Sequence, residues 1–415
     1  MKNKKNALLL FCLFAIFYSL YFYLGFLLSQ TKAFSGFNIL FEYDTPRVIG
    51  DIASFSSNHG RTSIHPIYVL LVNPLGCSLS YLIHSKLLAA VIINSFFGAA
   101  SVVLAFIFFR IFSRNYFDSL LLSGIFGLSM SQLITGAVPE TFSLAILSLM
   151  ITYILFLVDS EKKNLHFRLW VLAGIFSLGI TTTNFMQTLI CFISITICLP
   201  KDNTKKLFNL INIFIFVATV VFAVGLLAII QKMIYRSATL FFLPKSFGEE
   251  ICRLSPFIIL HPFQMITQVF KHFFFVNVIG PLPFLHTTGR IIPSIHFYDS
   301  WNYLLVGWLG TILWLGFLCV GVFKNLRENK EKHLFFTGIL SCLLFNMILH
   351  SFYGIIKERP ELFIYTSHFT FLVLIYLSNY APLKKVPVRI CLVVLLLLVG
   401  SNNLIIMSKI INIYK

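Results

Sequence analysis

The chain has 415 residues, of which 58% are hydrophobic and only 11% are charged. Soluble domains carry about 25% charged residues, so this composition excludes an ordinary soluble protein and predicts a chain that crosses a membrane many times. The net charge of +17 does not indicate a nucleic-acid partner, because the bases form short clusters between apolar runs, as membrane anchors and orientation signals do.

The cysteines give no sign of a disulfide framework or a zinc site. Most of the eight lie inside apolar runs, and none forms a C-x-x-C pair, so we expect neither. The first apolar run is longer than the core of a signal peptide and lacks a small-residue cleavage site. We therefore expect it to remain as a helix.

Apolar runs that are long enough to span a bilayer recur along the whole chain. We expect an all-α, polytopic fold with about eleven transmembrane helices, forming a single integral membrane domain over 1–415. The runs are 7–29, 87–109, 118–137, 141–158, 169–183, 184–200, 207–231, 302–323, 333–350, 362–380 and 390–408. Segment 66–76 is too short to span and contains Pro74, so it predicts a re-entrant or juxtamembrane helix.

Lysine and arginine clusters indicate the orientation of the chain. With a cytoplasmic N-terminus, most of these residues lie in short inner loops, which agrees with the positive-inside rule. The clusters include Lys4, Arg110, Lys162, Lys201, Lys324 and Lys384. We therefore expect the functional loops to lie on the outer face of the membrane. The long outer loop 232–301 is rich in aromatic residues and broken by Pro and Gly, which predicts interfacial helices on the outer leaflet.

The first outer loop, 30–65, carries the most informative polar residues. Asp44 precedes Pro46 and can cap a helix that continues toward Gly60. On that helix Arg47 lies one turn after Asp44, and Asp51 lies one turn further on the same face. The alternative for Asp44 is capping alone, and Asp51 could simply pair with Arg47. Arg61 and His65 follow just before the next apolar run.

A second candidate acid lies between two apolar runs. Glu140 follows Pro139 at the outer end of one run and immediately precedes TFSLAILSLM. A carboxylate near the hydrocarbon edge is costly unless it faces a polar cavity. We therefore place Glu140 beside Asp44 as a candidate catalytic residue that positions substrate. The alternative is a helix cap or a surface acid.

A third outer patch spans 350–369. Glu361, Tyr365 and His368 have helical spacing, so they would line one face of the helix that enters the membrane. Arg359 is a candidate bidentate anchor for a phosphate. The alternative is an aromatic belt with ordinary flanking charges.

Together these residue types suit one reaction. A carboxylate can take a proton from an attacking hydroxyl, and cations can stabilise the charge that grows on a departing phosphate. Phosphate has a second pKa of about 6, so it leaves without needing an acid. A lipid-linked phosphate donor at a membrane surface fits this set.

The residues resemble the GT-C superfamily of membrane glycosyltransferases, which includes aminoarabinose transferases and protein O-mannosyltransferases. Asp44-Thr45-Pro46-Arg47 is similar to the first-loop motif of that family, His65-Pro66 to its following element, and Pro139-Glu140 to its second acid. Thr45 stands where many relatives carry another acid. The topological resemblance covers most of the chain.

The resemblance implies transfer of a sugar from a polyprenyl-phosphate donor, with inversion and with Asp44 as the base. The acceptor would be a glycan, a lipid or a protein. Substrate-binding residues would be Arg47, Asp51, Arg61, His65, Arg359, Glu361, Tyr365 and His368. No cofactor is implied, and a divalent metal is neither required nor excluded.

Two other classes stay open. An O-antigen polymerase or ligase also acts on lipid-linked sugars, but it would place its key bases in one large late outer loop, for which 232–301 is the candidate. A transporter or flippase of lipid-linked glycans would show paired broken helices and charges near the middle of the membrane. The acidic first-loop motif favours the glycosyltransferase.

Overall fold

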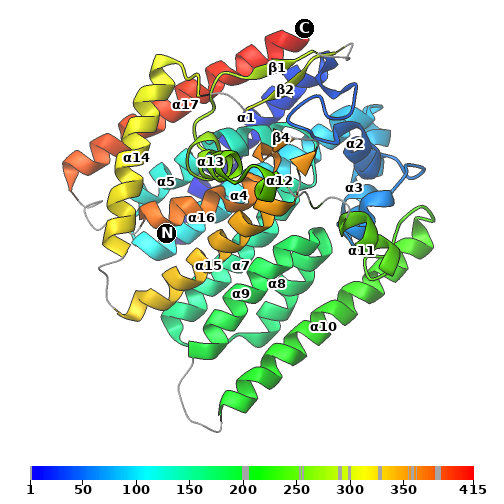
Figure 1. Cartoon of the computed structure of the whole chain (residues 1–415), viewed down its shortest axis with the longest axis horizontal. Coiled ribbons are helices and arrows are strands. Elements are labelled where there is room, and N and C mark those ends of the chain that lie inside the picture. Colours follow the sequence, from blue (N-terminus) through cyan, green and yellow to red (C-terminus); the bar gives the residue numbers. More distant parts are fainter. Residues whose placement is uncertain are drawn as a thin grey trace.

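The computed structural model describes residues 2–198, 205–251, 254, 257–287, 292–297, 301–325, 330–353, 355–356, 359–360, 362–378 and 385–415. The fold is almost entirely helical (Figure 1). The long helices are α1 (Lys2–Ser29), α4 (Lys86–Ser113), α7 (Phe142–Lys162), α10 (Lys205–Ile234), α14 (Leu305–Asn325), α15 (Lys330–Phe352) and α17 (Val386–Tyr414).

Shorter helices complete the bundle and its loops. They are α2 (Thr45–Ala53), α3 (Tyr68–Ile83), α5 (Tyr116–Leu128), α6 (Met130–Ala137), α8 (Phe167–Ile180), α9 (Thr182–Cys198), α11 (Pro244–Ile251), α12 (Phe257–Leu260), α13 (Pro262–Lys271) and α16 (Ser367–Ser378). Single turns occur at η1 (Lys32–Phe34), η2 (Gly60–Ser63), η3 (His272–Val276) and η4 (Phe363–Tyr365).

Within the described residues, seven helices are long and apolar enough to cross a membrane, or eight if the bent pair α5–α6 is one span. The fold is therefore that of a multi-pass membrane protein. Each of the eleven expected runs contains a helix, but α8, α9 and α16 are too short to pass the same length test. The count of about eleven spans is thus not confirmed.

The run expected at 118–137 is not one straight helix. It breaks at Ser129, where α5 and α6 meet at 64°. The Ser129 hydroxyl accepts a hydrogen bond from the backbone N–H of Gln132, so Ser129 caps a new helix instead of continuing the old one. The bend sends the chain toward the Pro139–Glu140 turn.

Helix α4 lies at the centre of the bundle. It packs against α1, α5 and α7, while α8 packs between α7 and α10. Helix α10 lies along one edge of the bundle (Figure 1), and it exposes Leu210, Phe214 and Phe222. Exposed apolar side chains on a spanning helix are the expected lipid-facing surface.

Two expected element boundaries in the first outer loop are wrong. Helix α2 ends at Ala53, because Ser54 is extended, and Gly60 instead begins the turn η2. The short helix expected at 66–76 is α3, which starts at Tyr68, includes Pro74 and continues to Ile83.

Loop 232–301 contains short helices α11, α12 and α13, and two antiparallel strands, β1 (Phe284–His286) and β2 (Ser294–His296). Strand β2 also pairs with the first outer loop, through a parallel bridge between Ile295 and Leu40. A second hairpin pairs β3 (Ile355–Ile356) with β4 (Arg359–Pro360). Strand β2 therefore links loop 232–301 to the first outer loop.

Candidate functional site

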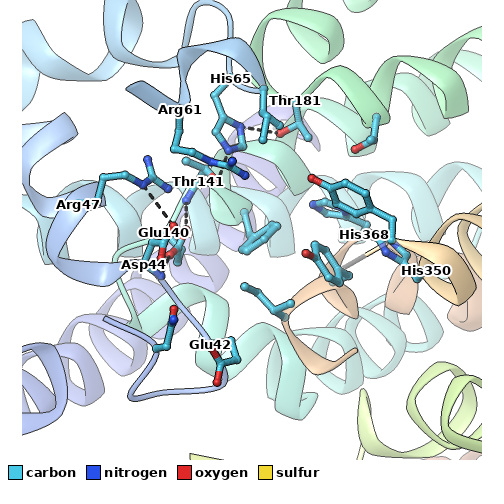
Figure 2. A pocket seen from close by; sticks show the side chains of 17 residues that line it. Glu42, Asp44, Arg47, Arg61, His65, Glu140, Thr141, Thr181, His350 and His368 are labelled. Atoms are coloured by element: carbon cyan, nitrogen blue, oxygen red, sulfur yellow. Dashed lines mark hydrogen bonds and ion pairs between the residues drawn. The ribbon is translucent and has the colours of Figure 1, made fainter. Parts of the chain in front are cut away.

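A cavity of about 270 Å³ lies where the first outer loop meets the turn after α6 and the segment around η4 (Figure 2). Polar side chains from segments distant in sequence line it. The lining residues are Asn38, Glu42, Asp44, Arg47, Arg61, Ile64, His65, Glu140, Thr141, Phe142, Thr181, Thr183, His350, Tyr353, Ile364, Tyr365 and His368. Seven of the ten residues that the sequence analysis selected are among them.

Asp44 precedes α2, but its side chain makes no capping hydrogen bond. The carboxylate is 39% exposed, and its Oδ2 lies 3.4 Å from Arg47 Nε. The Asp44 backbone is held by a hydrogen bond from its N–H to Glu140, while the Asp44 carboxylate remains partly exposed to water. Asp44 is therefore available to accept a proton from a bound molecule.

Glu140 is buried beside Asp44. Its Oε1 accepts the Asp44 backbone N–H at 2.8 Å, and its Oε2 accepts the Thr141 N–H at 3.0 Å. Burial raises the pKa of Glu140 to about 7, although Arg47 and these two N–H groups favour the charged form. Glu140 thus fixes the position of Asp44 and can change its own charge near neutral pH.

Arg47 extends from α2 between three carboxylates. Burial alone would lower its pKa, but Glu140, Asp51 and Asp44 raise it above its ordinary value. The guanidinium therefore stays charged. It supplies the cavity with a fixed positive charge that has several acceptors around it.

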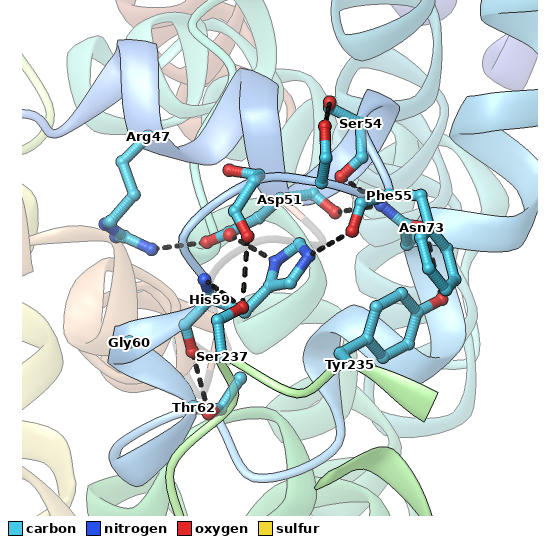
Figure 3. A network of polar contacts seen from close by, with 12 residues as sticks. Arg47, Asp51, Ser54, Phe55, His59, Gly60, Thr62, Asn73, Tyr235 and Ser237 are labelled. Carbon is cyan, nitrogen blue, oxygen red and sulfur yellow. Dashed lines mark hydrogen bonds and ion pairs between the residues drawn. The ribbon is translucent and has the colours of Figure 1, made fainter. Parts of the chain in front are cut away.

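Asp51 does not line the cavity, which corrects the expectation that it binds substrate. Its Oδ2 accepts a hydrogen bond from Arg47 Nη1 at 2.7 Å, and its Oδ1 lies 2.8 Å from Nδ1 of the fully buried His59 (Figure 3). Both carboxylate oxygens are therefore paired with protein groups, and Asp51 orients the Arg47 side chain from outside the cavity. Its partner His59 packs edge-on against Tyr235 and was missed by the sequence analysis.

Arg61 reaches the cavity from η2. Its Nη1 donates to Glu250 Oε1 at 3.0 Å. The Tyr353 hydroxyl donates to Glu250 Oε2. Glu250 belongs to α11, so this ion pair connects loop 232–301 to the cavity wall. A phosphate that bound Arg61 would compete with this carboxylate.

His65 lies on the cavity wall, but it does not supply a positive charge. Burial, together with the nearby Arg47 and Arg61, lowers its pKa to about 3. Its Nδ1 bonds to the Ile180 carbonyl at 2.8 Å, and its Nε2 lies 3.4 Å from the Thr141 hydroxyl. His65 therefore donates through Nδ1 to the Ile180 carbonyl, and its neutral Nε2 can accept from the Thr141 hydroxyl, so His65 offers no positive charge to a substrate.

The opposite wall is aromatic. His350 stacks on Tyr365 with ring centroids 4.4 Å apart, and Phe142 meets His368 edge-on at 5.1 Å. Tyr365 and His368 share this wall, although the chain changes from the turn η4 to α16 between them. Glu361 lies outside the described residues. Arg359 is in β4, and its side chain is outside the description as well.

Glu42 and Asn38 were also missed as lining residues. Asn38, Phe41 and Glu42 all have left-handed backbone, with φ of 57°, 50° and 61°. Non-glycine residues rarely adopt this conformation, and such strain is concentrated at functional sites. Strand β2 holds the loop, since the Phe41 N–H donates to the Ile295 carbonyl at 3.0 Å. The only sequence signal was an acid, Glu42, two residues before Asp44.

Over the described ranges, no group of three or more His, Cys, Asp or Glu side chains could hold a metal ion. Comparison with known protein-family models and with curated proteins finds no match to this chain. The cavity geometry is therefore the basis for a functional assignment. It combines the accessible carboxylate of Asp44, the more enclosed acids Glu42 and Glu140, two guanidinium groups and an aromatic wall.

Proposed function

We propose that this protein is a GT-C-type glycosyltransferase that moves a sugar from a polyprenyl-phosphate donor to an acceptor hydroxyl. The observation that carries the proposal is that the partly exposed Asp44 carboxylate, which makes no capping hydrogen bond, lines one cavity with the Arg47 and Arg61 guanidinium groups. A base next to fixed cations is what displacement of a phosphate leaving group needs.

In this mechanism the Asp44 carboxylate accepts the proton of the acceptor hydroxyl as its oxygen attacks the anomeric carbon. The bond from that carbon to the phosphate oxygen breaks in the same step, with inversion. Arg47 and Arg61 stabilise the negative charge that collects on the departing phosphate. Glu140 holds the Asp44 backbone, and the wall formed by Tyr365, His350 and Phe142 offers aromatic faces to the sugar.

The proposal includes a membrane arrangement. The short helices α8, α9 and α16 would complete about eleven crossings by packing inside the bundle. Helices of loop 232–301 would lie on the outer leaflet: α13 exposes Phe263, Ile266 and Phe270 on one face, which is the pattern of an interfacial helix. The cavity would then open on the outer face of a bacterial inner membrane.

One observation weighs against the O-antigen polymerase alternative. Among the described residues that line the cavity, the arginines come from the first outer loop rather than from loop 232–301. The late loop instead contributes an acid, Glu250, to the pair with Arg61. A polymerase that binds diphosphate-linked glycans through a late basic loop would show the opposite distribution.

The test is a donor comparison with purified protein and a membrane-lipid extract as the acceptor source. Three donor classes are supplied separately: polyprenyl-monophosphate sugars, polyprenyl-diphosphate glycans and nucleotide sugars. Mass spectrometry follows the product. We expect transfer from the monophosphate class alone. Transfer only from the diphosphate class would support the polymerase, and transfer only from nucleotide sugars would refute the proposed donor.

A further inference from the structure

A second hollow lies far from the candidate site, on the side of the bundle formed by α4, α7 and α8. It is a groove of about 730 Å³ with an almost wholly apolar lining. Its walls include Leu104 and Ile107 of α4, Ile151 and Leu155 of α7, and Leu172 of α8. This volume is in the range of sites that hold a ligand of lipid or drug size.

The groove has the depth of one membrane leaflet. It follows α7 from Ile151 to Lys162, and eleven residues of α-helix rise about 16 Å. The hydrocarbon core of a bilayer is about 30 Å thick, so one leaflet accounts for about half of that distance. A single acyl chain lying along α7 therefore matches both the length and the apolar lining.

The open end of the groove is polar and basic. Lys162 and His166 line it there. The fully buried Asp159 fixes His166: its Oδ1 lies 2.6 Å from His166 Nδ1, and its Oδ2 accepts the His166 backbone N–H at 3.1 Å. Trp170 Nε1 donates to the same Oδ2 at 2.8 Å.

Because these donors surround the Asp159 carboxylate inside the protein, its charge does not face the groove. The His166 ring remains 36% exposed, its Nε2 lies 3.4 Å from Asn164 Nδ2, and both His166 and Lys162 line the groove. Lysine and histidine at the end of an apolar groove between helices suit the phosphate of an anionic lipid head group.

This groove is separate from the candidate site. Helix α7 begins at Phe142, which lines the cavity, and ends at Lys162. Its length of about 30 Å equals the hydrocarbon thickness of a bilayer. The two hollows share no lining residue, and the groove lies along the half of α7 that ends at Lys162.

We propose that this groove is a binding site for an anionic phospholipid of the leaflet opposite to the cavity. One acyl chain lies between α4, α7 and α8, and the head-group phosphate contacts Lys162 and His166. The inference does not depend on the proposed function.

The test measures retained lipid by native mass spectrometry. Purified protein is exchanged into vesicles of equal parts phosphatidylglycerol and phosphatidylcholine and then released into detergent. We expect wild-type protein to retain phosphatidylglycerol preferentially. Lys162→Gln should lower that preference about fivefold, as expected for loss of one lysine at a membrane surface. The matched control is Lys163→Gln, which removes the same charge from the next residue, one that does not line the groove.

Ile151→Trp provides a second test if Lys162→Gln does not fold. The larger ring should fill the deep end of the groove and reduce retention of both lipids. Three results would overturn the proposal: equal retention of both lipids by wild-type protein, an equal loss in Lys162→Gln and Lys163→Gln, or unchanged retention in Ile151→Trp.

Discussion

Asp44, Asp51 and Glu140 lie within one small region, yet each carboxylate has a different environment. Asp44 is 39% exposed and only loosely paired with Arg47. Asp51 is buried and paired on both oxygens. Glu140 is buried against two backbone N–H groups. In the proposed mechanism these differences suit Asp44 to accept a proton, Asp51 to position Arg47, and Glu140 to hold the Asp44 backbone.

The raised pKa of Glu140 makes the stability of the protein depend on pH. Glu140 binds its proton more tightly in the folded protein than in the unfolded chain. Its contribution to the free energy of unfolding is therefore fully present below about pH 4.5 and is lost as pH rises through about 7. A shift of this size corresponds to about 3 kcal/mol in the free energy of unfolding. Thermal unfolding in detergent should show wild-type stability falling from pH 5 to pH 8. The decrease should be much smaller in Glu140→Gln, and equal decreases would contradict this assignment.

The paired and exposed acids should respond differently to loss of charge. Asp51→Asn leaves Arg47 and His59 without a buried carboxylate, so the free energy of unfolding should fall by about 3 kcal/mol. Asp44→Asn is the matched control. It removes a longer, partly exposed pair and should cost less than about 1 kcal/mol. Denaturation of both variants in detergent measures the difference. A similar loss in the two would show that Asp44 is structural.

At the scale of elements, helix α2 presents the site residues, and α3 holds it in place. The two helices are in close contact, and Gly76 on α3 lies against the backbone of Ile52 on α2. A Cβ at Gly76 would meet the carbonyl oxygen of Ile52, and a backbone atom cannot rotate aside. The position of Arg47 therefore depends on the small size of Gly76.

Gly76→Val should push α2 away from α3 and lower the free energy of unfolding by about 1–3 kcal/mol. It should also reduce any activity that needs Arg47. Gly225→Ala is the matched control, because a Cβ at that position of α10 meets nothing within 4 Å. That change should raise stability by about 0.5–1 kcal/mol through helix propensity. Denaturation in detergent measures both changes in stability. A Gly76→Val protein as stable as wild type would contradict the conclusion that close packing of α2 on α3 requires Gly76.

The sequence predicted parts of the site because acids and arginines are scarce in an apolar chain. Asp44 and Glu140 stood out for this reason, and the structure places both at one cavity. The pairing of Arg61 with Glu250 joins residues 189 positions apart, and no local pattern encodes such a distance. The low pKa of His65 was not predictable either, because it depends on burial that only the folded chain provides.

The prediction of element boundaries was limited in the same way, because boundaries also depend on contacts between distant residues. Hydropathy located the apolar runs, because side chains that are buried in the bundle and side chains that face lipid must both be apolar. It could not separate one span from two short helices, as the break at Ser129 shows. It also could not foresee that strand β2 would pair with residues near Leu40, since that contact depends on the path of the long loop.

At the scale of the whole molecule, helix α7 connects two separate hollows. The candidate site lies at the start of that helix and the lipid groove at its end. Lysine and arginine clusters favour an inner location for the groove end, which would place the cavity where lipid-linked donors are used outside the cytoplasm. This arrangement lets the site and the groove be tested independently.

The most direct test of the central claim compares transfer by wild-type protein and Asp44→Asn, purified at equal yield and given the donor class that wild type uses. Glu161→Gln, an exposed acid at the far end of α7, is the control. We expect Asp44→Asn to lose about 10²–10⁴-fold in transfer rate while donor binding persists and the control keeps its activity. Transfer by Asp44→Asn at the wild-type rate would contradict the assignment of Asp44 as the base.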